Sequence, residues 1–113
     1  MNAPETPSLH RFDAYRLSLD FRRIVLTWLP LKRAELSDQL DRASISISLN
    51  VAEGAGRALP RERARHYTIA RGSAVECLAC LDLLELETSV EQMPEARVVL
   101  LRVLSVLTAL IRR

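Results

Sequence analysis

The 113-residue chain contains few aromatic residues and few glycines. Aromatic residues make up 4% of the sequence, so leucine, valine, isoleucine and alanine must fill most of any core. Three glycines together with 49% hydrophobic residues exclude an intrinsically disordered chain. The length suits one domain that buries about two-thirds of its unfolded surface and leaves no room for a second.

Long apolar runs are also lacking. The most apolar segment, near the C-terminus, is interrupted by Arg102, Ser105 and Thr108 and stays below the roughly 20 residues that a membrane span needs. The first residues, MNAPETPSLHRF, have neither the basic region nor the apolar region of a secretory signal. We therefore expect a cytoplasmic protein without membrane contact, with a flexible tail over residues 1–10 and a folded domain over residues 11–113.

The two cysteines, Cys77 and Cys80, form a CxxC motif. In a thioredoxin-like redox site this motif begins a helix after a strand, where the helix dipole lowers the thiol pKa. Here it lies inside a long helical pattern, and only His10 and His66 are available to complete a metal site. The sequence therefore predicts two buried core cysteines, with no metal and no cofactor.

The stretch SISISLN, residues 44–50, alternates polar and apolar residues like a half-buried strand. Over residues 36–54, however, apolar residues recur every three or four positions, as on one face of a helix. A lone strand would leave its backbone groups without partners, because no other strand-like run exists in the sequence. We predict a helix over 36–54, with Ser37 as N-cap or in the first turn, and Gly54 and Gly56 as its C-terminal stop.

Three further helices follow from the same periodicity. They are predicted over residues 12–28, which Pro30 ends, over about 60–88, which Pro60 begins, and over about 96–110. The longest has a seam with alternating spacings of three and four residues: Tyr67, Ala70, Ala74, Cys77, Leu81 and Leu84. Four helices with short loops predict an all-α, antiparallel up-down-up-down four-helix bundle.

The last helix is apolar over most of its circumference. Its own seam consists of Ala96, Leu100, Val103, Leu107 and Leu110. Beyond this seam it carries a second group of apolar residues: Val99, Leu101, Leu104, Val106 and Ile111. Helices that are apolar nearly all round are usually buried on more than one side. We predict a subunit interface and a homo-oligomer, the alternative being an apolar surface helix.

Charge is distributed unevenly, although the net charge is only +2. Residues 57–71 hold five arginines and one glutamate, whereas residues 72–96 hold six acidic residues and no basic one. In the predicted bundle one end combines four of these arginines with three from the two termini of the bundle: Arg11, Arg57, Arg61, Arg63, Arg65, Arg112 and Arg113. Copies assembled with parallel axes would join these ends into a ring suited to nucleic-acid phosphates. The alternative is that the arginines are simply solvated.

Tyr67 is the one aromatic residue among these arginines, so recognition of the phosphate backbone or of shape is favoured over base stacking.

Two segments resemble a known family. LSDQLDRASISISLNVAEGAGR and YTIARGSAVECL are similar to the four-helix-bundle proteins encoded in intervening sequences of bacterial 23S rRNA genes. The matched motif residues include Arg42, Asn50, Glu53, Gly54 and Glu76. The resemblance implies a barrel-like homopentamer. It also implies similarity to the accessory variability determinant of diversity-generating retroelements, which binds a reverse transcriptase and nucleic acid through a basic surface.

Catalysis is not predicted. Ferritin-like metal sites need Glu-x-x-His pairs, whereas Glu62 and His66 are four residues apart and have no second pair. Asn50, Glu53 and Glu76 lack an accompanying nucleophile or phosphate loop.

We therefore predict a non-catalytic oligomeric adaptor for RNA or DNA, for a nucleic-acid enzyme such as a reverse transcriptase, or for both. The alternative is a structural oligomer that binds only a protein partner. For Asn50 and Glu53 we expect a polar cluster with Arg42, Arg57 or the start of the third helix, the alternative being a ligand site.

Overall fold

The computed structural model describes Leu9 and residues 12–113, and within them the chain forms four helices and no strand. They are α1 (Asp13–Trp28), α2 (Ala34–Ala55), α3 (Pro60–Glu87) and α4 (Met93–Ile111). The predicted all-α four-helix bundle is confirmed. Apart from Leu9, the predicted tail over residues 1–10 lies outside the described residues.

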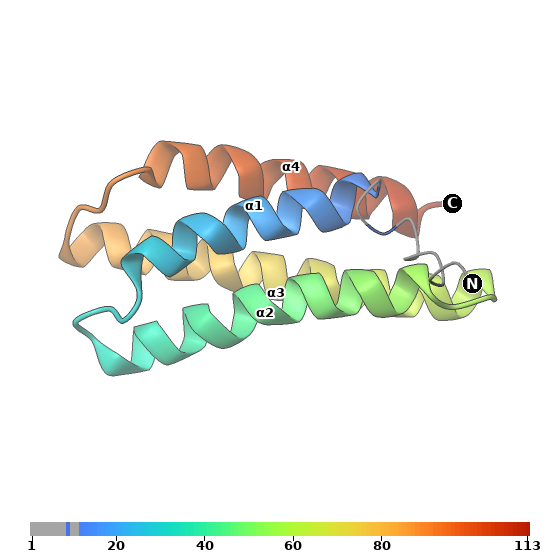
Figure 1. The fold of residues 1–113 in the computed structure, drawn as a ribbon, viewed down its shortest axis with the longest axis horizontal. Coiled ribbons are helices and arrows are strands. Elements are labelled where there is room, and N and C mark those ends of the chain that lie inside the picture. Colours follow the sequence, from blue (N-terminus) through green and yellow to red (C-terminus); the bar gives the residue numbers. More distant parts are fainter. Residues whose placement is uncertain (1–8, 10–11) are drawn as a thin grey trace, which may run out of the picture.

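Successive helices are joined at opposite ends of the bundle (Figure 1). The α1–α2 and α3–α4 connections lie at one end, and the α2–α3 connection lies at the other end with the C-terminus. Each helix packs against two others, in the cyclic order α1, α2, α3, α4, and the α2–α3 interface is the most extensive.

The core follows the predicted seams. All six α3 seam residues are buried, as are Ala96, Leu100, Val103 and Leu107 of α4, while Leu110 is half-buried. Cys77 and Cys80 are free thiols in this core, as predicted. Burial raises the pKa of both thiols, which keeps them protonated at neutral pH.

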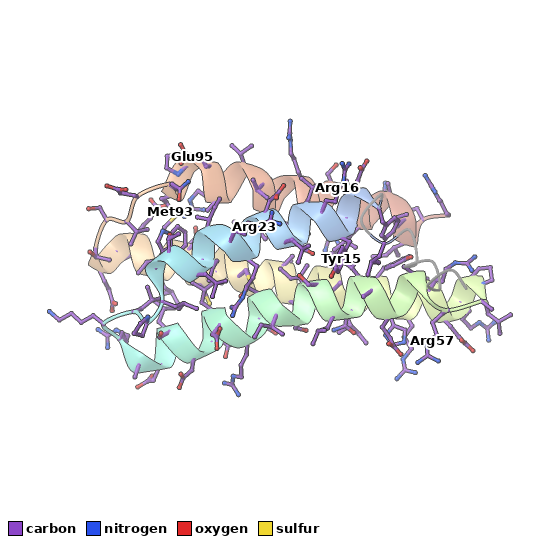
Figure 2. The ribbon with its side chains drawn as sticks, in the orientation of Figure 1. Tyr15, Arg16, Arg23, Arg57, Met93 and Glu95 are labelled. Carbon is purple, nitrogen blue, oxygen red and sulfur yellow. The ribbon has the colours of Figure 1, made fainter. Side chains whose placement is uncertain are left out.

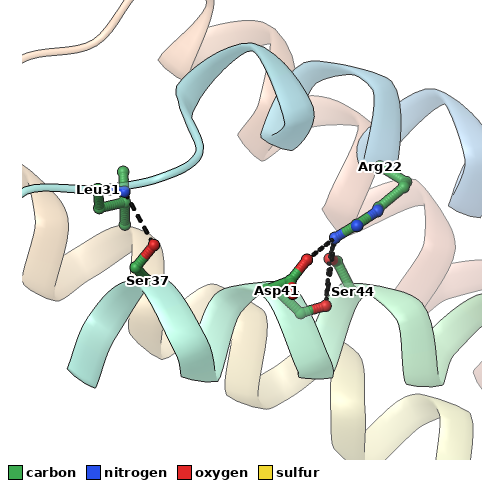
Figure 3. Close-up of polar contacts among 5 residues, drawn as sticks. All are labelled: Arg22, Leu31, Ser37, Asp41 and Ser44. Atoms are coloured by element: carbon green, nitrogen blue, oxygen red, sulfur yellow. Dashed lines mark hydrogen bonds and ion pairs between the residues drawn. The ribbon is translucent and has the colours of Figure 1, made fainter. Parts of the chain in front are cut away.

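The start of α2 differs from the prediction. The helix begins at Ala34, three residues before Ser37, and its N-cap residue Arg33 makes no side-chain capping bond. The buried Ser37 Oγ instead accepts a hydrogen bond from the Leu31 backbone N–H at 2.8 Å (Figure 3). Ser37 as N-cap was therefore wrong, whereas the alternative, Ser37 in the first turn of the helix, is confirmed.

The end of α2 also differs. Gly54 is buried inside the helix, and the chain leaves the helix only at Gly56, whose φ of −85° requires no glycine. Gly54 as a helix stop was therefore wrong, and a close contact with α3, described below, explains its lack of a side chain.

The serines of the 44–50 stretch lie between helices. Arg22 Nη1 of α1 donates to Asp41 Oδ1 at 2.7 Å and to Ser44 Oγ at 2.8 Å (Figure 3). One helical turn further, Ser48 Oγ donates to Ser18 Oγ of α1 at 2.9 Å. The strand-like alternation therefore arises because α2 presents hydroxyl groups to its neighbours on both sides of Ile47, which is fully buried.

Most of the apolar surface of α4 packs within its own chain. Val99, Leu104, Val106 and Ile111 pack against the core of their own bundle. Leu101 and its neighbour Val98 are the exceptions, being 54% and 55% exposed. The α4 surface available to a second subunit is thus narrower than the sequence suggested. None of the helices in the described part of the chain is long and apolar enough to cross a membrane.

Candidate nucleic-acid interface

The predicted arginines of the described chain belong to segments that meet at one end of the bundle. Arg57, Arg61, Arg63 and Arg65 surround the α2–α3 connection, and Arg112 and Arg113 follow α4 at the same end (Figure 1). Figure 2 shows Arg57 at this end and Met93 and Glu95 at the opposite one. Arg11, the remaining predicted member, lies outside the described residues.

Two of these arginines are engaged within the chain. Arg57 Nη2 donates to Glu53 Oε1 at 2.5 Å, one turn back on α2. Arg63 Nη1 donates to the backbone carbonyls of Arg57 and Ala58, at 3.2 and 2.7 Å. Arg63 thereby satisfies carbonyl groups left free where α2 ends, which gives it a structural role that sequence reasoning had not assigned.

The other four are unengaged. Arg61, Arg65, Arg112 and Arg113 are exposed, and no guanidinium group among them has a hydrogen-bond or ion-pair partner within the described residues. A planar guanidinium with free donors is well suited to paired hydrogen bonds with a phosphate group.

We call the end of the bundle that carries Arg57, Arg61, Arg63, Arg65, Arg112 and Arg113 the arginine end. A hollow of about 310 Å³ lies between this end and the core. Arg63 and Arg113 line it from α3 and from the residues after α4, beside the rings of Phe12 and Tyr67. The two ring centroids are 6.0 Å apart. Burial raises the pKa of the Tyr67 hydroxyl, and the nearby charge of Arg63 acts in the opposite direction, so the phenol is protonated at neutral pH.

Tyr67 packs directly on Gly54. A Cβ added at Gly54 would lie 2.6 Å from Tyr67 Cε1 and 3.2 Å from the Arg63 carbonyl oxygen. The missing side chain therefore allows α2 to approach α3 just below the arginines.

The motif residues of α2 and α3 lie along the same helix pair. Asn50 Nδ2 donates to the Ser46 carbonyl at 3.0 Å and to Ser46 Oγ at 3.1 Å. Ser46 Oγ in turn shares a hydrogen bond with Ser73 Oγ of α3 at 2.7 Å. Asn50 thus supports a link between the two helices, whereas exposed Glu53 pairs only with Arg57, just beyond the end of its own helix.

Glu76 is held by a different α2 residue. Gln39 Nε2 donates to Glu76 Oε2 at 2.6 Å. Arg42 lines a shallow hollow beside this pair and has no partner of its own among the described residues. The structure therefore separates the motif into an Asn50 group, a Glu76 group and the exposed Glu53–Arg57 pair.

At the opposite end several acidic residues are paired. Arg33 Nε binds Glu87 Oε1 at 2.5 Å, and Arg97 binds both Asp82 at 2.8 Å and Glu85 at 2.5 Å. The excess of acidic charge at this end is consequently smaller than the sequence blocks suggested.

Sequence reasoning missed two basic features. Arg71 Nε donates to Thr108 Oγ1 at 2.9 Å and ties α3 to α4 near the basic end. A separate hollow of about 780 Å³ between α1 and α4 is lined by Arg16, Arg23 and Arg102. Arg16 and Arg23 are paired there with Asp13 and Asp20, which weakens the positive potential of that groove. Spacing on α1 could have revealed these pairs, because they lie three residues apart.

Metal binding finds no support in the described residues. No group of three or more His, Cys, Asp or Glu side chains in this part of the chain is placed to hold a metal ion. His66 Nδ1 is buried and has no hydrogen-bond partner among these residues.

These features define a four-helix bundle with exposed, unengaged arginines at one end. The family described as 23S rRNA-intervening sequence protein matches residues 11–98, and the chain belongs to that family. The match covers α1, α2, α3 and the start of α4. Comparison with curated proteins gives no match.

Proposed function

We propose that the protein is a non-catalytic homo-oligomeric adaptor that binds the phosphate backbone of RNA or DNA through its arginine end. One observation carries the proposal: Arg61, Arg65, Arg112 and Arg113 are exposed at one end without partners among the described residues. Burying or pairing them would have removed their donors from any ligand, whereas here the donors remain free for phosphate oxygens.

Oligomerisation multiplies this surface. Copies with parallel axes place several such ends together, and the family resemblance implies five copies. The proposed protein partner is a nucleic-acid enzyme such as a reverse transcriptase. The enzyme and the adaptor would then bind the same nucleic acid. The groups weighed for acid–base chemistry have other roles: Asn50 bonds Ser46, Glu76 bonds Gln39 and Glu53 pairs with Arg57.

The test compares two triple variants with the same loss of charge. One replaces Arg61, Arg65 and Arg112 with glutamine, sparing Arg63 because of its carbonyl contacts. The control replaces Arg23, Lys32 and Arg42 with glutamine; these are exposed basic residues of α1, the α1–α2 connection and α2, away from the arginine end. Fluorescence anisotropy with labelled structured RNA and with duplex DNA is recorded between 50 and 200 mM salt.

We expect wild type and control to bind with an affinity that falls steeply with salt, and the arginine-end variant to bind at least ~10-fold more weakly with a shallower salt dependence. Equal affinity of the two triple variants would contradict the proposed surface. No binding of wild-type protein to either nucleic acid at 50 mM salt would contradict nucleic-acid recognition and favour a purely protein partner.

A further inference from the structure

One face of α3 carries exposed apolar and small residues along the second half of the helix. Gly72, Val75, Ala79, Leu83 and Leu86 are all exposed and recur at spacings of three and four. Leu86 is 84% exposed, an unusual position for a leucine on a helix of this length. A contiguous stripe of exposed apolar side chains marks a surface that contacts another molecule.

Gly72 has no explanation within the chain. A Cβ added there would meet nothing within 4 Å, so no neighbouring atom of the same chain requires a glycine. In the middle of a helix a glycine costs about 1 kcal/mol relative to alanine. A missing side chain on an exposed helix face is what a close approach by another backbone requires.

Beside this stripe lies an apolar groove with a mainly acidic rim. The groove, about 400 Å³ in volume, runs between α2 and α3, with Leu36, Ala79, Cys80, Leu83 and Leu86 among its lining residues. Its charged rim consists of three acidic residues and one basic residue: Glu35, Glu76, Glu87 and Arg33. We call this groove and the α3 stripe the α3 face.

The exposed ridge of α4 has the opposite charge. Val98, Leu101, Ser105 and Ala109 are exposed at spacings of three and four, and α4 has no acidic residue after Glu95. Arg102 lies next to this ridge, is exposed and has no partner among the described residues. We call these residues the α4 face.

The apolar residues of the α4 face and those of the α3 face lie at matching positions along the bundle axis. Arg97 bonds Asp82 and Glu85, and Arg71 bonds Thr108, which fixes how α4 is aligned along α3 within one chain. At the helical rise of ~1.5 Å per residue, Leu101 then lies level with Ala79, and Ser105 with Val75. Rotation about an axis parallel to the bundle keeps these heights for a second copy. Leu101 and Val98 of one copy therefore meet the apolar groove of the other copy, and Ala109 of the first lies level with Gly72 of the second.

We propose that the α4 face of one copy docks on the α3 face of a second copy of this chain. The inference rests on the assembly in the proposed function and assigns its contact surfaces. Pairing either face with itself would bring like charges together, whereas Arg102 of the α4 face complements the mainly acidic rim of the α3 face. A contact between two different faces of a chain continues from copy to copy and closes into a ring or extends as a filament.

The first experiment uses two complementary double variants. One carries Val98→Glu and Leu101→Glu on the α4 face, and the other carries Leu83→Glu and Leu86→Glu on the α3 face. Leu26→Glu is the matched control, because Leu26 and Leu83 are both 53% exposed and Leu26 lies on α1 outside both faces. Far-ultraviolet circular dichroism verifies that all variants are helical, and light scattering after size exclusion gives their masses.

We expect wild type and the control to be assembled and each double variant to be a 12.8 kDa monomer. An assembled double variant of either kind overturns the inference. A monomeric wild type overturns both the inference and the oligomeric part of the proposed function. Assembled wild-type protein with assembled face variants leaves the proposed function intact and rejects only these faces.

The second experiment tests the pairing of faces by disulfide trapping. Chains carrying only Ser105→Cys are mixed with chains carrying only Val75→Cys under mild oxidation, and the native cysteines remain buried. We expect a crosslinked dimer in the mixture and much less in either sample alone. Replacing the Val75→Cys chain with a Leu26→Cys chain should abolish it. A dimer of Ser105→Cys chains alone, or no excess over the Leu26→Cys mixture, overturns the α4-to-α3 pairing.

Discussion

The Tyr67 ring of α3 occupies the space in which any side chain at Gly54 of α2 would begin. The added Cβ would come within 2.6 Å of the ring and 3.2 Å of a backbone oxygen. Movement of the ring alone would not remove the second contact, so α2 would have to shift away from α3. This contact lies next to Arg63, which joins helix packing to the geometry of the arginine end.

Gly54→Ala should therefore destabilise the fold, although alanine favours helix. We expect overpacking to cost about 1–3 kcal/mol, more than the ~1 kcal/mol gained in helix propensity. Gly72→Ala is the control, because its Cβ would enter open space and only the propensity gain applies within the chain. Urea unfolding at a concentration where the chain is monomeric measures both. A stabilised Gly54→Ala protein would contradict the close contact.

The Ser46–Ser73 hydrogen bond should couple α2 to α3. Removing both hydroxyls by alanine substitution is expected to show a coupling free energy of about 0.5–1 kcal/mol in a double-mutant cycle. The bond is part-buried and is reinforced by Asn50 on the α2 side. Ser105→Ala, in an exposed position, should leave the free energy of unfolding nearly unchanged. Additive effects at Ser46 and Ser73 would show that the bond is not formed in solution.

Arg63 and Arg61 should differ although they are two residues apart. Arg63→Gln removes the donor to the Ala58 carbonyl and should lower stability by about 1 kcal/mol while also weakening nucleic-acid binding. Arg61→Gln should weaken binding at unchanged stability, because Arg61 has no partner among the described residues. Thermal melts and anisotropy on the same samples separate the two effects. Equal melting temperatures would remove the structural role of Arg63.

The buried thiols should make the protein less stable at alkaline pH. Because burial raises the pKa of Cys77 and Cys80 above the ordinary 9.0, the unfolded chain loses these protons first as the pH rises. The stabilisation is complete below about pH 9 and declines above it, by roughly 1 kcal/mol at pH 10 for Cys77, and Cys80 acts in the same direction. Urea unfolding under reducing conditions should show a shallower decline for Cys77→Ala/Cys80→Ala than for wild type. Parallel declines would contradict burial of the thiols.

Much of the fold could be predicted because helical periodicity reports burial directly. The α3 seam from Tyr67 to Leu84 is buried throughout, and the strand-like serines lie on a helix because the longer repeat governs the segment. Individual contacts between residues far apart in the sequence produce no periodic pattern from which they could be predicted. The Ser37 hydroxyl accepts a hydrogen bond from Leu31 instead of capping α2, and the contact with Tyr67 explains Gly54 better than a helix end does.

The sequence predicted which arginines lie at this end of the bundle, but not which of them are free to bind a ligand. Short connections between helices place these residues at one end, which follows from topology. Which guanidinium groups stay free depends on individual contacts, such as Arg63 with the Ala58 carbonyl and Arg57 with Glu53. The four-residue spacing of Glu53 and Arg57 did indicate their pair, whereas periodicity and charge counts carry no information about a contact such as that of Arg63 with the Ala58 carbonyl.

The most direct test of the adaptor is light scattering after size exclusion, run with and without structured RNA at 50 and 200 mM salt. We expect a species several times the 12.8 kDa chain mass that carries RNA at 50 mM salt and loses most of it at 200 mM. A 12.8 kDa monomer at micromolar concentration that elutes apart from RNA at 50 mM salt would contradict it.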